Sequence, residues 1–367
     1  MIKKLFSWIF EPADAIYNDL KKNRIEEIIN DCEITLPKKE LITKSSNDSS
    51  LFRPLNFNQY IGQARAKDIL KSYLSNIQKR NMTMPHILLS GSAGLGKTTL
   101  AKIIANELQV NFKEIISSKI ESSKQLYDLL KDLDGGVLFL DEAHALSRDL
   151  VEPLYPIMED FKIGDSNTTN NKRITIYPEG FTPKEETSDK IKPFTLIGAT
   201  TEVGEIIKTR RPFYDRFKIK LELEDYNLDE IKLIINQYMK KTFPSDVIDS
   251  NSLHDIASNS RFVPRRAIAL LEASVLMGDT NKALNSYQII KNGYTKKDLK
   301  VLEIIGQHPK GVGLQALTSY LGISQATYNY EIEPYLLRNN LILRGTRGRI
   351  LSTEGKTVLA SLKGISP

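Results

Sequence analysis

Short apolar runs alternate with longer amphipathic stretches in the middle of the chain. The runs are HILLSG at residues 86–91, GGVLFLDEAH at 135–144 and PFTLIGATT at 193–201. Runs of this length are typical of buried strands, whereas the stretches between them have the spacing of amphipathic helices. Strands that alternate with helices predict a parallel sheet covered on both faces, which places this region in the α/β class.

The pattern changes on either side of this region. Residues 1–50 form an N-terminal extension that ends in the polar, loop-like stretch TKSSNDSS, and residues 51–225 carry the α/β pattern. Residues 226–295 lose the strands and contain helical stretches such as DEIKLIINQYMKK and PRRAIALLEASVLM. Residues 296–367 have helical stretches followed by LILRGTRGRILST, a strand–turn–strand pattern. Helices followed by a basic two-stranded wing predict a winged-helix domain.

Charge narrows the choice of partner. The formal net charge is +6, and residues 296–367 carry ten Lys or Arg against five Asp or Glu, so most of the excess lies in the predicted winged helix. A local basic patch favours a polyanion such as DNA. The single cysteine, Cys32, excludes a disulfide framework or a cysteine-rich zinc site. No apolar run is long enough to span a bilayer, so we expect a cytoplasmic protein with no membrane partner.

The stretch LLSGSAGLGKTTL carries a phosphate-binding motif. Gly91, Gly94, Gly96, Lys97 and Thr98 complete G-x-x-x-x-G-K-[ST] between a predicted strand and a predicted helix. Glycines let backbone N–H groups approach phosphates, and the helix N-terminus adds positive potential. The lysine neutralises phosphate oxygens and the threonine hydroxyl can ligate Mg²⁺, so the motif predicts binding of ATP with Mg²⁺.

Two acidic residues follow the next apolar run. Asp141 is expected beside the phosphates as a metal-holding residue, and Glu142 is suited to orient the attacking water. His144 is given no role. Thr200 and Thr201 end the third run, where a hydroxyl can sense the terminal phosphate.

Together, these motifs and their flanking residues resemble a known family. GLGKTTLAKIIANEL, LFLDEAHALS, LYPIMEDFK and FTLIGATT are similar to the AAA+ ATPases, and within them to the RuvB family of bacterial Holliday-junction branch-migration motors. RPLNFNQYIGQ, GVGLQAL and EPYLLRNNLILRGTRGR continue the match, which covers roughly residues 51 to 360. The resemblance implies an AAA+ parallel-sheet ATPase domain, a helical lid and a winged helix that contacts DNA, either a four-way junction or a duplex. It also implies a homo-oligomeric ring, a hexamer, and a junction-binding partner, RuvA.

The resemblance assigns roles to individual residues. Glu142, Thr201 as first sensor, Arg265 as second sensor and Arg216 as the finger that reaches a neighbour's nucleotide form the catalytic set, and Thr98 and Asp141 hold the metal. Arg344 and Arg349 match the DNA-contacting arginines of the wing. The implied nucleotide-binding residues are Phe52, Arg53, Tyr60, Ile61, Gly94, Gly96, Lys97, Thr98, Thr99, Glu159, Asp160, Phe161, Tyr226 and Arg265.

The chain also departs from the family pattern. Glu202 and Tyr214 stand where the family usually has arginines, and Arg210 and Arg211 are candidates to compensate. Residues 162–193, where the family places its RuvA-binding hairpin, are longer here and open with the polar stretch GDSNTTNN. Use of a RuvA-like partner therefore stays open.

Three functions remain at this stage. The first is an ATP-driven DNA translocase for branch migration in recombination and repair. The second is an AAA+ loader or remodelling ATPase that acts on a protein, for which no clear aromatic–apolar pore loop is found. The third is a nucleotide-binding module without turnover, against which the complete catalytic set argues. The basic wing favours the first.

Overall fold

The computed structural model describes residues 53–80, 82–161 and 191–364. The expected N-terminal extension, Phe52 and most of residues 162–193 lie outside the described residues. No helix in the described ranges combines the length and the apolar character needed to cross a membrane.

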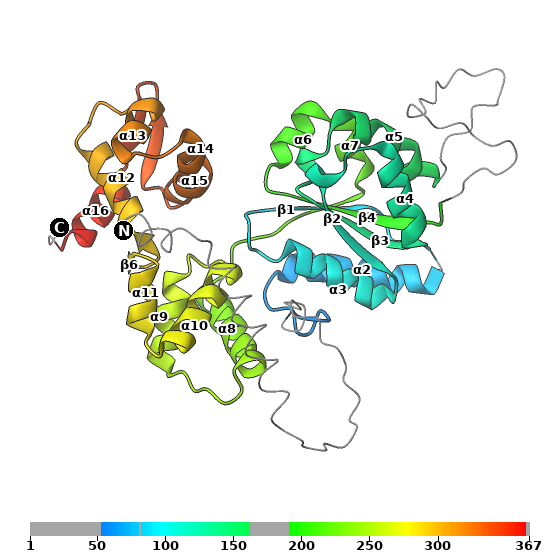
Figure 1. Ribbon diagram of the computed structural model, residues 1–367, viewed down its shortest axis with the longest axis horizontal. Coiled ribbons are helices and arrows are strands. Elements are labelled where there is room, and N and C mark those ends of the chain that lie inside the picture. Colours follow the sequence, from blue (N-terminus) through cyan, green and yellow to red (C-terminus); the bar gives the residue numbers. More distant parts are fainter. Residues whose placement is uncertain (1–52, 81, 162–190, 365–367) are drawn as a thin grey trace, which may run out of the picture. The chain divides into compact units, whose positions relative to one another are not determined.

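A parallel sheet forms the centre of the first domain (Figure 1). Its strand order is β2-β3-β4-β1-β5, and the three strands expected from the apolar runs are β1, β3 and β4. The edge strands β2 and β5 were not expected, because FKEII and IKLE mix charged and apolar residues, and an edge strand buries less of its surface than a central one. The strands are β1 (Ile87–Ser90), β2 (Phe112–Ile116), β3 (Gly136–Asp141), β4 (Phe194–Thr200) and β5 (Ile219–Glu222).

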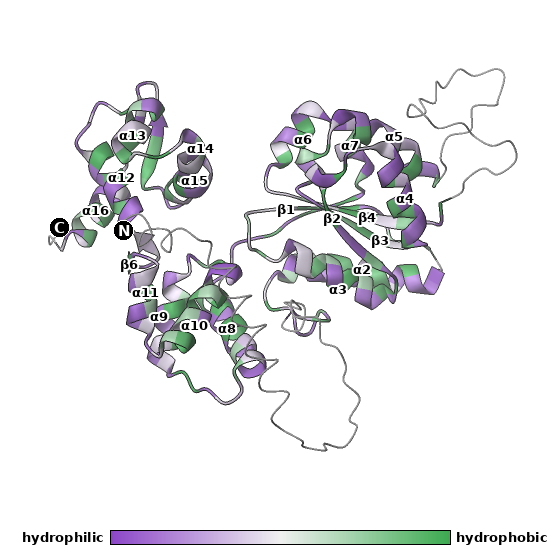
Figure 2. Cartoon of the chain, in the orientation of Figure 1, coloured by the Kyte–Doolittle hydropathy of each residue, from purple (hydrophilic) through white to green (hydrophobic). Residues whose placement is uncertain are grey.

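Helices cover both faces of this sheet, as predicted (Figure 1). Alternation along β1 explains the two layers: Ile87 and Leu89 belong to one buried cluster and Leu88 to the other. Figure 2 shows apolar residues concentrated on the strands and on the inward faces of the helices. One face carries α2 (Ala64–Arg80) and α3 (Lys97–Leu108), and the other carries α4 (Ser123–Leu133), α5 (Arg148–Asp160), α6 (Val203–Thr209) and α7 (Arg211–Arg216).

A helical lid follows the sheet. Its first helix starts with a capping box in which Asn227 and Glu230 bond each other's backbone N–H groups. The lid helices are α8 (Leu228–Thr242), α9 (Ser250–Asn259), α10 (Pro264–Met277) and α11 (Thr280–Ser286). The expectation of no strands in residues 226–295 was wrong, because β6 (Ile289–Lys291) and β7 (Tyr294–Thr295) form a short hairpin. Asn292 and Gly293 supply the two positive φ angles of its turn, and this Asn-Gly pair was the signal to find it.

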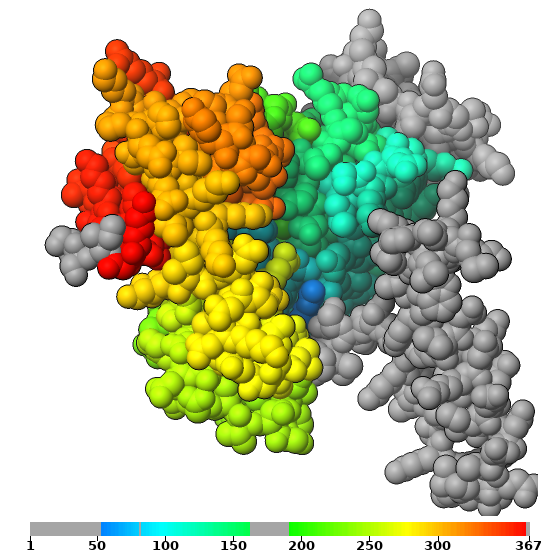
Figure 3. All heavy atoms as spheres, turned by 60° about the vertical axis from the view of Figure 1, so that its left-hand side comes forward, coloured from blue at the N-terminus to red at the C-terminus, as the bar shows by residue number. Residues whose placement is uncertain are grey.

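The winged helix follows the hairpin directly in the sequence, and Figure 3 shows its atoms in orange to red. The predicted wing is confirmed: β8 (Ile342–Gly345) and β9 (Gly348–Leu351) pair antiparallel, with Arg344 opposite Arg349. The helices are α12 (Lys296–Gly306), α13 (Leu314–Leu321), α14 (Gln325–Thr327), a π-helix (Tyr328–Ile332), α15 (Glu333–Arg338) and α16 (Thr353–Leu362). They enclose a separate hydrophobic core.

Candidate active site

The phosphate loop connects the end of β1 to the start of α3. Gly94 and Gly96 have φ angles of 85° and 98°, a region that side chains rarely adopt. A Cβ at Gly96 would lie 2.9 Å from the Tyr60 hydroxyl, and one at Gly94 would lie 2.8 Å from Cγ1 of Val263 in the lid. The glycines therefore allow close packing against both neighbours as well as the backbone conformation of the loop.

Lys97 is the buried charge at the centre of this loop. Its ammonium donates to the carbonyl oxygens of Gly91 at 2.7 Å and Ser92 at 3.1 Å. Burial lowers the pKa of Lys97, the carboxylates of Glu142 and Asp141 oppose this shift, and Arg265 adds to it. The predicted phosphate, metal, water-orienting and second-sensor residues thus influence one another electrostatically around one ammonium group.

The end of β3 places the two predicted acidic residues next to each other. The N–H of Glu142 donates to Oδ1 of Asp141 at 3.1 Å, and Glu142 has a positive φ of 50°, which turns the chain sharply after the strand. The Thr201 hydroxyl lies 3.5 Å from Oε2 of Glu142. The predicted first sensor, at the end of the neighbouring strand β4, therefore contacts the predicted water-orienting residue.

His144 is the residue that sequence reasoning missed at this site. Its Nδ1 lies 3.2 Å from Oε2 of Glu142 and 3.0 Å from the Thr200 hydroxyl, so it joins the ends of β3 and β4. Arg210 donates to the His144 carbonyl oxygen at 2.6 Å. The only signal in the sequence was its position two residues after Glu142. A histidine just after a strand does not by itself predict a functional role, because the role depends on which side chains lie next to it.

Tyr60 and Tyr226 flank the phosphate loop. The Tyr226 hydroxyl donates to the carbonyl oxygen of Leu95 at 3.1 Å, and the Tyr60 hydroxyl lies 3.5 Å from that of Gly96. Burial raises the pKa of both phenols, so both stay neutral donors. Two of the expected adenine-pocket residues therefore lie against the loop. The third, Ile61, follows Tyr60 directly in the sequence.

The other predicted nucleotide-binding residues lie on α3, on α10 and in the segment before α2. Thr98 and Thr99 lie in the first turn of α3, and Arg265 lies in the first turn of α10 with its Cβ beside Gly94. Nη1 of Arg53 is buried without a hydrogen-bond partner among the described residues.

Arg216 and Glu159 form a pair at the junction of α7 and α5. Nη2 of Arg216 lies 3.1 Å from Oε1 of Glu159, and its guanidinium lies 4.1 Å from the centre of the Tyr155 ring. Arg216 also donates to the carbonyl oxygen of Pro212 at 2.8 Å. These partners lie on α5 and α7, and none of them belongs to the phosphate loop or to the end of β3.

Phe161 is the C-cap residue of α5. It caps the helix with a left-handed φ of 53°, and its ring packs edge-on against Phe194 at 5.9 Å. It also lies near the buried His86, whose Nε2 bonds the Met158 carbonyl and whose Nδ1 accepts the Leu196 N–H. Asp160, the residue before Phe161, is exposed.

The two predicted DNA-contacting arginines share one buried carboxylate. Glu333 is 0% exposed, and both guanidiniums bond it through two nitrogens, with shortest distances of 2.6 Å for Arg344 and 2.7 Å for Arg349. Burial would raise the pKa of Glu333, but hydrogen bonds from Arg349 and Arg344 outweigh it and lower the pKa. The Arg344 side chain is 62% exposed and that of Arg349 only 14%. Arg344 is therefore more accessible to a partner than Arg349, and the DNA contact of both arginines stays a prediction.

Comparisons with known proteins agree with this architecture. Residues 52–223 match the Holliday junction DNA helicase RuvB P-loop domain, and residues 291–360 match the RuvB C-terminal winged helix domain. The Holliday junction branch migration complex subunit RuvB of Campylobacter lari is 36% identical over 324 residues, which cover 84% of this chain and 90% of that protein. The Prochlorococcus marinus protein of the same name is 34% identical over 362 residues, with 92% and 98% covered.

Solved structures give the same result. The Thermotoga maritima RuvB Holliday junction branch migration motor superposes with a TM-score of 0.67 at 32% identity, covering 84% of this chain and 98% of that one. A point mutant of the same protein gives a TM-score of 0.68 with the same identity and coverage. The match extends over the P-loop domain, the lid and the winged helix. This chain belongs to the RuvB family.

Proposed function

We propose that this protein is an ATP-driven DNA motor that promotes branch migration of Holliday junctions in recombination and repair. The observation that carries the proposal is the phosphate loop, with Asp141, Glu142 and Arg265 around Lys97, in the same chain as a basic winged helix. The relatives are named as branch migration proteins, which favours this function over a loader or a remodelling ATPase.

The site suits ATP with Mg²⁺. The Thr98 hydroxyl and the Asp141 carboxylate are hard oxygen donors, and Mg²⁺ is commonly held by one or two such groups together with substrate phosphates. Bound there, Mg²⁺ would neutralise charge on the phosphates. Lys97 would neutralise the remaining oxygens, helped by the potential of the α3 N-terminus.

Glu142 would orient the attacking water and accept its proton. Its side chain is bracketed by the Thr201 hydroxyl and His144 Nδ1, at 3.5 and 3.2 Å from Oε2. These two groups restrict the carboxylate to few orientations, so less freedom is lost in the transition state. We therefore assign Thr201 and His144 as positioning residues for Glu142.

We further propose that the chain works in the cytoplasm as a hexameric ring in which Arg216 acts on the neighbouring subunit's nucleotide. Its contacts to Glu159 and Tyr155 support this, because they hold the guanidinium against α5 and include no group of its own phosphate loop. Glu159 and Asp160 would then lie at the subunit boundary. A RuvA-like protein would deliver the ring to the junction, and Arg344 would contact the DNA backbone.

ATP turnover by the full chain tests the main proposal. We expect four-way-junction DNA to raise turnover more than duplex of equal length, and Glu142→Gln to bind ATP while losing turnover by about a hundredfold or more. Glu121→Gln, an exposed carboxylate that is not among the predicted site residues, is the matched control and should behave as wild type. Stimulation by a protein substrate and not by DNA would favour the loader, and near wild-type turnover by Glu142→Gln would remove its assignment.

Mixing two inactive variants tests whether Arg216 acts across the boundary between subunits. Tested alone, Lys97→Ala should bind ATP poorly and Arg216→Ala should hydrolyse ATP poorly. An arginine finger contributes about a thousandfold to the rate of hydrolysis. A mixture forms some boundaries with intact Lys97 on one side and intact Arg216 on the other, so part of the activity should return. If subunits demonstrably exchange and no activity returns, Arg216 does not act in trans.

A further inference from the structure

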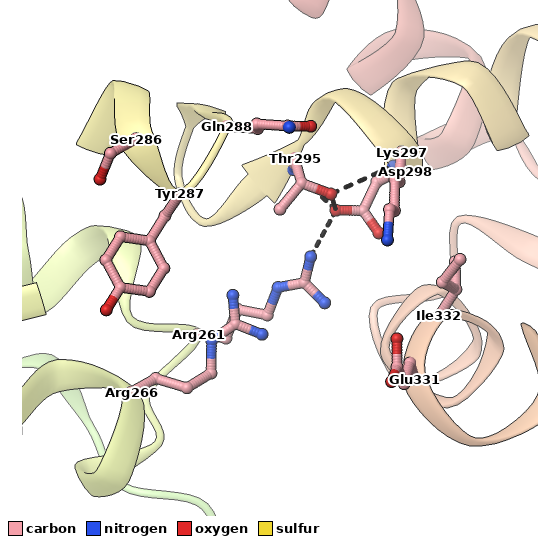
Figure 4. Close-up of a pocket in the computed structure, with 10 residues that line it drawn as sticks. All are labelled: Arg261, Arg266, Ser286, Tyr287, Gln288, Thr295, Lys297, Asp298, Glu331 and Ile332. Atoms are coloured by element: carbon pink, nitrogen blue, oxygen red, sulfur yellow. Dashed lines mark hydrogen bonds and ion pairs between the residues drawn. The ribbon is translucent and has the colours of Figure 1, made fainter. Parts of the chain in front are cut away.

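A polar pocket of about 490 Å³ lies where the lid meets the winged helix (Figure 4). Arg261 and Arg266 enter it from the lid, Lys297 and Asp298 from the start of α12, and Glu331 from the π-helix. None of these residues belongs to the nucleotide site or to the wing arginines described above. A pocket of this size is large enough for a small ligand or one group of a larger one.

The charge of Arg261 is already balanced. It forms a buried ion pair with Asp298, with side chains 7% and 2% exposed, and donates to the Gly293 carbonyl at 2.9 Å. Its guanidinium also lies 3.8 Å from the centre of the Tyr335 ring. The same Asp298 oxygen accepts from the Thr295 N–H and hydroxyl. All of these bonds are made to Oδ2 of Asp298, so Arg261 is the cation that Asp298 pairs with directly.

Arg266 is the unbalanced group. Figure 4 shows its guanidinium beside that of Arg261, and within the described part of the chain it makes no hydrogen bond or ion pair. Burial and the Arg261 charge lower the pKa of Arg266, and the charges of Asp298 and Tyr335 oppose this shift only in part. Lys297 and Glu331 are exposed and likewise unpaired among the described residues. The free groups are thus two cations against one carboxylate.

We propose that this pocket binds a phosphate group, with Arg266 as its principal donor and Lys297 at its rim. A guanidinium offers a planar fork of N–H donors that matches phosphate oxygens, and an anion between Arg266 and Lys297 would relieve the repulsion with Arg261. Two sources share this chemistry: a backbone phosphate of DNA, or a free phosphate or phosphorylated small molecule. The site does not depend on the proposed motor function.

Binding of radiolabelled inorganic phosphate to the full chain tests the site. A slowly hydrolysed ATP analogue with Mg²⁺ first fills the phosphate loop, so that it does not contribute. We expect Arg266→Gln to weaken phosphate binding about tenfold or more, the loss of one charge-assisted hydrogen bond, and Lys297→Gln to weaken it less. Arg266→Lys should retain part of it, and Lys300→Gln, an exposed lysine on the same helix, should change nothing.

Duplex binding at several salt concentrations identifies the source. If Arg266→Gln also lowers the slope of log affinity against log salt by about one, while Lys300→Gln does not, the phosphate is that of DNA. If the slope is unchanged but phosphate binding is lost, the ligand is a free phosphate compound. Wild-type phosphate binding and wild-type DNA binding by both Arg266→Gln and Lys297→Gln would overturn the site. Variants that change only subunit assembly, with phosphate and DNA binding unaltered, would also overturn it. Junction-stimulated turnover, measured on the same variants, reports separately on the motor function.

Discussion

Protonation of a buried histidine should set the acid limit of the ATPase domain. His86 is 6% exposed at the start of β1. Its Nδ1 accepts the Leu196 N–H at 2.9 Å, so Nε2 carries the proton and donates to the Met158 carbonyl at 3.0 Å. A second proton on Nδ1 would face a backbone N–H and break this bond. Burial, helped by the Lys218 charge and opposed by the bond to Met158, lowers the pKa of His86 to about 4.

The sign and size of the effect follow from this pKa. The unfolded chain takes up the proton near pH 6.5, whereas the folded chain does so only near pH 4. The contribution of His86 to stability is therefore constant above pH 6.5 and falls as the pH drops through this window, by about 1.4 kcal/mol for each pH unit. At pH 5 the loss is about 2 kcal/mol, which corresponds to about 4–8 °C in melting temperature for a domain of this size.

Calorimetric melting of wild type, His86→Gln and His254→Gln between pH 8 and pH 5 measures this loss. Glutamine at position 86 can keep both hydrogen bonds without taking up a proton, and the exposed His254 is the matched control. The melting temperature of His86→Gln should approach that of wild type, or pass it, as the pH falls. A constant difference between the two across the whole range would refute the reasoning.

Three further predictions concern the sites. Arg344→Ala should weaken duplex binding and lower its salt slope by about one while the wing stays folded; an unchanged slope would move the DNA contact elsewhere. Asp298→Ala leaves Arg261 buried without its partner and should lower the free energy of unfolding, measured by calorimetry, by about 3–5 kcal/mol. The double change Arg261→Met with Asp298→Leu should cost less, and an equal loss would contradict the ion-pair explanation. Thr201→Val should slow turnover about tenfold, or about 1.4 kcal/mol in activation free energy, with ATP affinity unchanged, because it frees Glu142; weaker ATP binding alone would argue against that role.

The central elements of the ATPase domain could be predicted from the sequence. Strands β1, β3 and β4 are buried on both faces and therefore read as continuous apolar runs. Each also ends at a group of polar residues, and the carboxyl ends of parallel strands share one edge of the sheet. Lys97 and Glu142 could therefore be placed together from the sequence alone. The edge strands gave no such signal.

Pairings between distant residues could not be predicted in this way. The sequence shows Arg344 and Arg349 in a basic turn, but not that the carboxylate of Glu333 lies beneath them. It likewise shows Arg216 and Glu159 as separate family positions, although the structure makes them an ion pair. Such contacts depend on how helices and strands pack, and local periodicity does not encode them. The individual roles assigned to these residues stay predictions until the variants are measured.

The strand order has a consequence for synthesis on the ribosome. β1 carries the phosphate loop, yet its neighbours in the sheet are β4 and β5, where Ile87 pairs with Ile197 and Ile219. The growing chain emerges from its N-terminus, so the loop is made long before either strand that supports it, and pairing over such distances is slow. A nascent chain that stops short of β5 should therefore fail to retain nucleotide. ATP binding by this protein would then report that translation has passed Glu222.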